Sequence, residues 1–294
     1  MAMGSLANIL KDPPPAYAFE LSESGIAFAK IGQVPQINFQ PFEEGVLSVS
    51  PVRDNIQKSE VLAEHIGALA PSSGGRKRRA ALILPDYCAR VALLDFDSFP
   101  SVAEEQRALI RFRMRKTLPF DVESAVVSYY AQPRAGQTGK IEVLAAVLAS
   151  EIVLRYEGPF RAAGFIPGFV TTSAIAMLNM LDPDGVTLVV KLNGRTLTAV
   201  VLDGAVVKLL RCVEITDGNQ EELESVVLPT LAYIEDELST TPKRILLCGL
   251  GLSGERIAQG WAQEWSVPVD TVRSRYGAPG PTNAGLLGYL ESVA

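Results

Sequence analysis

Two short apolar runs on either side of a polar turn stand near the start of the chain. Residues 17–21 read Tyr-Ala-Phe-Glu-Leu, residues 26–31 read Ile-Ala-Phe-Ala-Lys-Ile, and a Ser-Glu-Ser-Gly segment separates them. Apolar runs joined by a glycine-containing turn are typical of a β-hairpin. We therefore predict a hairpin here, and we expect a further strand at 45–49.

The rest of the chain alternates between strand-like apolar runs and amphipathic stretches with helical spacing. Asp54 can cap a first helix, and Ser101 with Glu104 forms a capping-box signature for a second. Strands that alternate with helices indicate an α/β protein. The expected strands lie at 80–85, 89–96, 122–130, 141–148, 165–170, 186–192, 196–202, 206–213, 244–248 and 267–269, and the expected helices at 54–69, 101–116, 150–163, 171–181, 219–238, 253–265 and 282–293.

A second hairpin pattern lies near the middle of the chain, where the turn at 193–195 contains asparagine and glycine. This turn occupies the same place in the second half of the chain as the turn at 22–25 occupies in the first. A length of 294 residues exceeds what one small core needs. The repeated pattern therefore predicts two similar lobes that meet near residue 170.

Composition fits a folded protein and argues against a nucleic-acid partner. Hydrophobic residues make up 48% of the chain and charged residues 20%, while the net charge of −6 leaves no surplus of cations for phosphate contacts. The one dense basic run, at 76–79, follows a Pro/Ser/Gly-rich stretch. We interpret it as a solvated linker, with docking to an anionic lipid or a partner as the alternative.

The few cysteines and histidines limit the chemistry of the chain. Cys88, Cys212 and Cys248 are far apart in apolar runs, which indicates buried free thiols in a reducing compartment. His65 is the only histidine, so we expect no metal site and no histidine-dependent catalysis. No apolar stretch approaches the roughly 18 residues of a membrane helix, and the first 15 residues lack a signal-peptide layout. Any membrane role is expected to go through a partner.

Three segments carry a resemblance to a known family. Residues 104–130 read EEQRALIRFRMRKTLPFDVESAVVSYY, an amphipathic helix, a Pro-Phe stop and a strand that ends in tyrosine; residues 246–257 read LLCGLGLSGERI, and residues 282–290 read TNAGLLGYL. In these segments the chain resembles the type IV pilus assembly protein PilM family. That family belongs to the actin, Hsp70 and sugar-kinase superfamily, and its plan is closest to that of the cell-division protein FtsA.

The resemblance implies a duplicated, actin-like (ribonuclease H-like) α/β fold. The first lobe would span 1–170 and include an inserted FtsA-type subdomain at about 45–148. The second lobe would span 171–294, with its small subdomain reduced because few residues separate Val213 from Asn219. The final helix, at about 282–293, would pack back on the first lobe.

The resemblance also implies a nucleotide cleft between two hairpin turns and a glycine segment, with motifs that are altered here. Ser22 stands in place of a glycine, Lys191 replaces an acidic residue that orients Mg²⁺, and Leu250 adds bulk beside the nucleoside. Glu23 adds a negative charge that would cost about 3 kcal/mol at roughly 5 Å from a phosphate, unless it points to solvent. The vestigial cleft would comprise Glu20, Ser22, Lys191, Asn193, Gly194, Gly249 and Gly251.

Lys191 has two interpretations at this stage. It could pair with Glu20 across the cleft and replace a metal site by an ion pair, or it could join Arg195 in holding an anion without metal.

A partner site is implied as well. Members of the PilM type bind the cytoplasmic N-terminal tail of the membrane protein PilN in a groove beside the inserted subdomain. Here that groove would lie near the helix at 101–116 and the strands around Leu82 and Val126. Phe112 and Met114 are candidate contacts, although Phe112 could instead pack in the core. The expected partner-binding residues are Arg107, Arg111, Phe112 and Arg115.

The resemblance therefore leads us to expect a cytoplasmic scaffold or adaptor of a type IV pilus or related secretion platform, held at the inner membrane through a PilN-like protein. It would be a pseudo-ATPase with no catalytic residues, metal or nucleotide cofactor. One alternative is an active, ATP-binding ATPase or phosphotransferase of the same superfamily. Another is a GspL-like cytoplasmic domain of type II secretion, and self-association as a homo-oligomer stays open.

Overall fold

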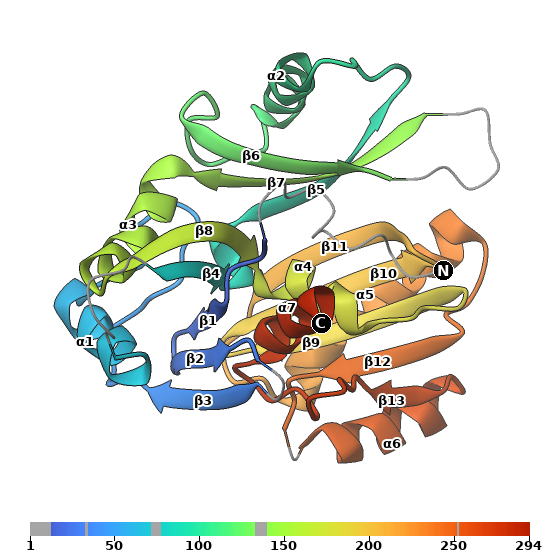
Figure 1. Cartoon of the computed structure of the whole chain (residues 1–294). Helices are drawn as coiled ribbons and strands as arrows, with labels where there is room; N and C mark the ends of the chain where they lie inside the picture. The colour runs from blue at the N-terminus through green and yellow to red at the C-terminus, as the bar shows by residue number, and fades with distance from the viewer. Residues whose placement is uncertain (1–12, 33–34, 72–77, 133–139, 252) are drawn as a thin grey trace.

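Two five-stranded sheets with the same plan form the body of the protein (Figure 1). The computed structural model describes residues 13–32, 35–71, 78–132, 140–251 and 253–294. The strand order of the first sheet is β3-β2-β1-β4-β8. Its strands are β1 Tyr17–Ser22, β2 Gly25–Lys30, β3 Gln36–Pro41, β4 Arg78–Leu84 and β8 Phe165–Thr172.

The second sheet repeats this plan in the order β11-β10-β9-β12-β13. Strand β9 pairs antiparallel with β10 and parallel with β12, as β1 pairs antiparallel with β2 and parallel with β4. The predicted duplication and both predicted hairpins are therefore confirmed. The strands of this sheet are β9 Val186–Asn193, β10 Thr196–Asp203, β11 Val206–Glu214, β12 Arg244–Cys248 and β13 Val269–Thr271.

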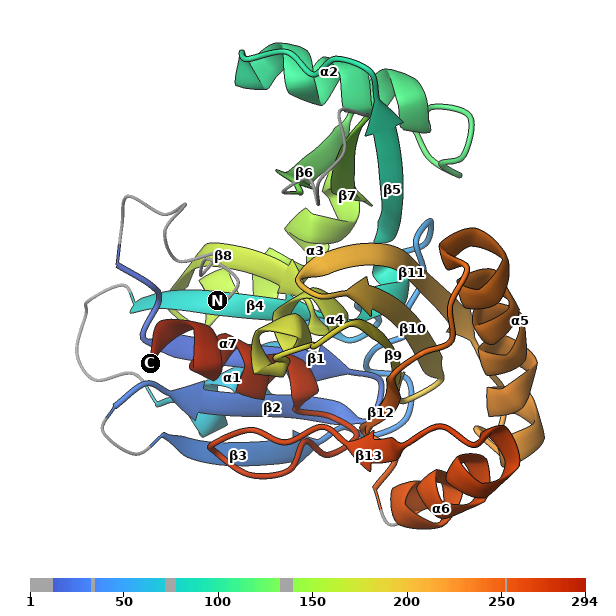
Figure 2. The same cartoon turned by 90° about the vertical axis from the view of Figure 1, so that its right-hand side faces the viewer.

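Helices cover the outer face of each sheet, and two further helices lie between the sheets (Figure 2). Helices α1 (Ser59–Leu69) and α3 (Ser150–Ala162) pack on the first sheet, and α5 (Gln220–Leu238) and α6 (Ser253–Trp265) pack on the second. Helices α4 (Ser173–Met177) and α7 (Ala284–Val293) occupy the space between them. Each sheet is consequently apolar on both faces, as expected for strands covered on two sides.

Glycines let α7 come close to its neighbours. A Cβ atom on Gly288 would lie 2.1 Å from the Ala176 carbonyl oxygen of α4, and one on Gly285 would lie 2.6 Å from Ile83 Cγ2 of β4. Only a residue without a side chain fits at either position. The helix pair can therefore pack tightly between the lobes, and α7 contacts the first sheet.

A third, smaller unit projects from the first lobe (Figure 1). It consists of the sheet β5-β7-β6, built from Arg90–Phe96, Ile141–Ala149 and Ala125–Ala131, with α2 (Ala103–Met114) on one face. Because β4 pairs with β1 and β8 in the first sheet, this unit starts at Arg90 and not near residue 45. We propose the division into lobes at about residue 170 with this narrower unit, 90–149, inserted in the first.

Several local predictions were wrong for identifiable reasons. The third strand lies at Gln36–Pro41, whereas Leu47 makes only an isolated bridge to Ile56. Helix α1 begins at Ser59, because the Asp54 carboxylate accepts a bond from the Ile56 N–H in a preceding turn. The capping box of α2 does not form, since Glu104 pairs with Arg107 at 3.3 Å instead.

Within the described ranges, no helix combines the length and the apolar character needed to cross a membrane.

Candidate functional site

The registers of the two sheets bring polar side chains together where the lobes meet. Glu20 pairs in register with Ile83 near the carboxyl ends of β1 and β4. In the second sheet, the cross-strand neighbours form a row that runs Cys248, Lys191, Thr198 and Cys212. Lys191 and Val189 are two residues apart on β9, so their side chains point to the same face of the sheet. Val189 packs between the lobes, and Lys191 therefore points into the same space. The interlobe junction therefore has a polar centre.

Glu20 is buried completely and is held by groups from three other elements. Its Oε1 atom accepts bonds from the Ser173 hydroxyl and, at 3.4 Å, from the Asn193 amide, and its Oε2 atom accepts from the Leu286 N–H at 2.7 Å. Burial raises the pKa of Glu20 to about 7, although the charge of Lys191 and the bonds from Ser173 and Leu286 act in the opposite direction. Both carboxylate oxygens are thus engaged by the protein itself.

Lys191 is also fully buried, and its partner is Asp86. Its ammonium donates to Asp86 Oδ2 at 2.8 Å. Burial alone would lower the pKa of Lys191, but the nearby charges of Asp86 and Glu20 hold it above its ordinary value, so the side chain stays cationic. The expected ion pair with Glu20 was therefore wrong in its partner, because Asp86 lies within bonding distance and Glu20 contributes only its charge.

Asp86 was missed in the sequence, although it binds both lobes. It lies in the 3₁₀ turn Asp86–Cys88 (η2) after β4, and it also accepts from the Thr198 hydroxyl at 3.1 Å and from the Ala174 N–H at 2.6 Å. The signal that could have found it is its position: a carboxylate two residues beyond a buried parallel strand, at the sheet edge where α/β proteins place their sites.

The three cysteines surround this ion pair from three different elements. They are free thiols, as predicted, and come from η2, β11 and β12. Burial raises the pKa of Cys212 and of Cys248 to about 12, and it raises that of Cys88 as well. Cys88 and Cys248 are buried in the junction, whereas Cys212 is partly exposed, and the raised pKa values favour the neutral thiol form of all three.

The turns of the predicted cleft are closed by their own side chains and by close backbone contact. The Ser22 hydroxyl donates to the Gly25 carbonyl at 3.0 Å. Gly194 and Gly251 adopt left-handed φ angles of 57° and 56°. Gly249 does so at 77°, and a Cβ atom there would lie 2.2 Å from the Leu192 carbonyl oxygen. The glycine segment after β12 therefore presses directly on the second hairpin.

Two charged residues near the predicted cleft bond to groups outside it. The Glu23 carboxylate accepts from the Val49 N–H at 3.0 Å, so it neither faces the cleft nor points freely into solvent. Arg195 is exposed and pairs with Glu214 at 2.8 Å. Because Lys191 is buried against Asp86, the structure does not bring it together with Arg195 as a pair of anion ligands.

The expected partner-binding residues on and beside α2 have different surroundings. Phe112 is 69% exposed, so core packing was the wrong interpretation for it, whereas Met114 is buried. Arg107 pairs with Glu104, Arg115 pairs with Glu123, and Arg111 donates to the Ala125 carbonyl at 3.2 Å. Phe112 therefore lies on the outer face of α2, about half a turn from the residues that face the sheet.

The expected groove strands are also unequal. Leu82 is completely buried in the first lobe and offers no surface, but Val126 on the edge strand β6 is 44% exposed and Tyr130 is 41% exposed. Near Val126, a cavity of about 300 Å³ separates the three-stranded unit from the first lobe. Its lining residues are Val52, Arg53, Asp54, Phe120, Asp121, Ser124, Ala149, Ser150, Glu151, Ile152 and Arg155.

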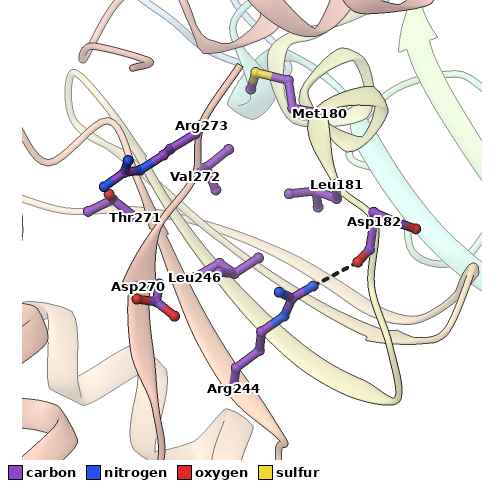
Figure 3. Close-up of a pocket in the computed structure, with 9 residues that line it drawn as sticks. All are labelled: Met180, Leu181, Asp182, Arg244, Leu246, Asp270, Thr271, Val272 and Arg273. Carbon is purple, nitrogen blue, oxygen red and sulfur yellow. Dashed lines mark hydrogen bonds between the residues drawn. The ribbon is translucent and has the colours of Figure 1, made fainter. Parts of the chain in front are cut away.

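A second cavity of about 370 Å³ lies at the other end of β12 (Figure 3). Arg244 crosses it and donates to the Asp182 carbonyl at 2.8 Å, while Asp270 and Arg273 line the wall formed by β13 and the residues after it. Sequence reasoning did not identify this cavity. Since Arg244 begins the strand that Cys248 ends, the cavity is separate from the Glu20–Asp86–Lys191 cluster.

Comparison with known proteins places the fold. No protein-family model matches the sequence, and neither does any of the curated proteins compared with it. The structure of a PilM–PilN type IV pilus biogenesis complex matches with a TM-score of 0.74 at 18% identity, over 96% of this chain and 100% of that one.

A protein of unknown function with an actin-like ATPase fold from Bacteroides thetaiotaomicron matches with a TM-score of 0.58 at 11% identity, over 93% and 94% of the two chains. The cytoplasmic domain of EpsL from the Vibrio cholerae type II secretion system reaches 0.48 at 14% identity, over 79% and 80%, which is too low to support an inference. The duplicated sheets, the helix pair between them and the first two likenesses together show that the protein has the actin-like ATPase fold.

Proposed function

We propose that this protein is a scaffold of a type IV pilus or related secretion platform, and that it binds the cytoplasmic tail of a PilN-like membrane protein. The observation that carries the proposal is the likeness to the PilM–PilN complex, which extends over the whole of that chain and 96% of this one. Through such a partner the protein would work on the cytoplasmic face of the inner membrane.

We further propose that the scaffold works as a pseudo-ATPase. Magnesium and a triphosphate require free carboxylates to orient the metal and its water. In this chain both Glu20 oxygens and both Asp86 oxygens already accept hydrogen bonds, and Lys191 neutralises Asp86. As the residues lie, they do not fit a magnesium nucleotide. Freeing them would leave a buried charge unpaired, which typically costs about 3–5 kcal/mol.

The cavity beside the three-stranded unit is the place that best suits the partner's tail. It is bordered by the N-terminal turn of α3 and by the segment that leads into β6. Its wall combines apolar Phe120 and Ile152 with charged groups of both signs, among them Arg155, which pairs with Asp54 at 3.3 Å. A short peptide segment needs this combination of an apolar anchor site and polar groups at the rim.

The three-stranded unit offers two candidate surfaces for the tail, because Phe112 and Val126 lie on its opposite faces. Val126 lies two residues after Ser124, which lines the cavity. Its side chain projects from the face of the sheet that α2 does not cover. We assign the tail to the Val126 side. The α2 residues Arg107, Arg111, Phe112 and Arg115 then belong to a separate surface.

Fluorescence anisotropy tests this assignment directly. The probe is a labelled peptide with the cytoplasmic N-terminal sequence of the PilN-like protein from the same genome. We expect Val126→Glu to weaken binding at least tenfold, because a carboxylate would be buried beside the tail, while Phe112→Ala changes the affinity less than twofold. The reverse pattern would move the site to α2, and a folded protein that does not bind the peptide at all would contradict the proposed partner.

A further inference from the structure

The two buried carboxylates belong to the first lobe, and their partners belong to the second lobe or to the helices between the lobes. Glu20 comes from β1, and Asp86 comes from the turn after β4. Asp86 reaches Lys191 of β9 at 2.8 Å and Thr198 of β10 at 3.1 Å. Glu20 reaches Asn193 of β9 at 3.4 Å. Three side-chain bonds therefore cross directly from the first lobe to the second sheet.

The same carboxylates also hold the start of each helix that lies between the lobes. Asp86 accepts from the Ala174 N–H in the first turn of α4, and Glu20 accepts from the Leu286 N–H in the first turn of α7. Orphan N–H groups at helix starts favour acidic partners, both through the hydrogen bond and through the helix dipole. Strands β9 and β10 and helices α4 and α7 are thus each bonded to one of the two carboxylates.

The arrangement is restrictive because it is buried. Lys191 and Glu20 are 0% exposed and Asp86 is 4% exposed. A charge in such surroundings requires its partner at bonding distance, since no water can replace it. Small rotations of one lobe against the other would separate Lys191 from Asp86 before either became solvated. The cluster therefore disfavours intermediate orientations of the lobes.

We propose that Glu20, Asp86 and Lys191 form a buried latch that fixes the two lobes against each other, so that charges of the chain itself set their relative orientation. The latch goes beyond the proposed scaffold function and does not depend on the identity of any partner. A second connection lies away from it, where Gln132 after β6 exchanges two hydrogen bonds with the Val207 backbone of β11, at 2.9 and 2.7 Å. Lys208 of β11 also pairs with Glu142 of β7 at 2.9 Å, and both of these outer connections are more exposed than the latch.

The cysteines provide a built-in measure of the latch. The chain contains three, and all of them adjoin the cluster. Cys88 and Cys248 are 0% and 1% exposed, so a thiol reagent reaches them only when the junction opens. The rate at which they are labelled under native conditions, with each site followed by mass spectrometry, reports how often the lobes separate.

Lys191→Met is the decisive variant, because it removes the cation whose charge is balanced by both buried carboxylates, Asp86 and Glu20. We expect Cys88 and Cys248 to be labelled at least tenfold faster than in the unsubstituted protein. Adding Asp86→Asn to Lys191→Met removes one of the two negative charges and should restore the rate to within about threefold. The matched control is Arg195→Met, which breaks the exposed pair with Glu214 and should leave the rate unchanged.

A thiol introduced by Val227→Cys distinguishes lobe separation from general unfolding. Val227 lies in the core between α5 and the second sheet, away from the junction. In the Lys191→Met background its labelling should stay within twofold of the value measured with Lys191 present. If Lys191→Met yields no folded protein, Asp86→Asn alone takes its place, with an expected acceleration of three- to tenfold.

The latch would be contradicted by any of three results. The first is unchanged labelling of Cys88 and Cys248 in the folded single variant. The second is a double variant that labels as fast as Lys191→Met. The third is equal acceleration at the position 227 thiol, which would mean that the cluster stabilises the whole fold and not the orientation of the lobes.

Discussion

A single proton on Glu20 links the interlobe junction to pH. The groups that face this carboxylate are Lys191 of β9, Cys248 of β12, and the donors from α4, β9 and α7. Burial raises its pKa from 4.5 to about 7, which means that the folded protein holds the proton more tightly than the unfolded chain. The contribution of this proton to the free energy of unfolding is therefore full below pH 4.5 and is lost as pH rises towards 7.

This linkage predicts a pH dependence that Glu20→Gln removes. Between about pH 5 and pH 8, the free energy of unfolding of the unsubstituted protein should fall relative to that of the variant by about 3 kcal/mol at most, with a plateau above about pH 7.5. Urea denaturation at half-unit pH steps measures both curves. Exposed Glu214→Gln is the control and should run parallel to the unsubstituted protein. Parallel curves for Glu20→Gln as well would show that Glu20 carries no raised pKa.

At the scale of the elements, the close contact of α4 and α7 depends on a residue without a side chain. A methyl group at Gly288 would lie 2.1 Å from the Ala176 carbonyl oxygen, so the helices would have to move apart. We expect Gly288→Ala to lower the free energy of unfolding by about 2 kcal/mol or more, as overpacked cores do. Urea denaturation with an unchanged m-value would measure the loss.

Gly260→Ala is the matched control, because this glycine is exposed on α6 and a methyl group there would meet no atom within 4 Å. Alanine is the better helix former, so the control should gain about 0.5–1 kcal/mol. Equal behaviour of the two variants would mean that α7 has room to shift.

The regular elements follow from the sequence pattern, whereas the contacts between them do not. The apolar runs of β1, β4, β9 and β12 are visible because strands covered on both faces need continuous apolar residues. Strand β3 was missed, since Gln36, Asn38 and Pro41 resemble a loop and are paired only at a sheet edge. The partner of Lys191 was also missed, because 105 residues separate it from Asp86 and only the fold brings the two together.

The location of the candidate site could be predicted, but the partners of its side chains could not. The resemblance placed Glu20, Ser22, Lys191 and Asn193 in one cleft beside the two hairpins, and the structure buries all four. Glu23 and Arg195 share the same turns, yet their side chains turn to Val49 and Glu214. Side-chain direction at a turn is set by neighbours that are distant in sequence, so the pattern could not decide it.

At the scale of the whole molecule, two similar lobes meet over a helix pair and a buried charge cluster, and a third unit projects from the first lobe (Figures 1 and 2). In our proposal the projecting unit binds the partner and the charge cluster keeps the lobes in one orientation. Such a molecule would present a rigid binding surface and would not cycle with a nucleotide.

Thermal unfolding with and without magnesium ATP tests this proposal most directly. A ligand present at about 100 times its dissociation constant stabilises a folded protein by about 2.7 kcal/mol, which raises the Tm by several degrees at this chain length. The side chains of Glu20, Asp86 and Lys191 already have partners within the protein, so none is free to bind magnesium or phosphate. We therefore expect the Tm at millimolar Mg-ATP to match the Tm without it within about 1 °C. A rise of several degrees that Lys191→Met abolishes would contradict the pseudo-ATPase proposal.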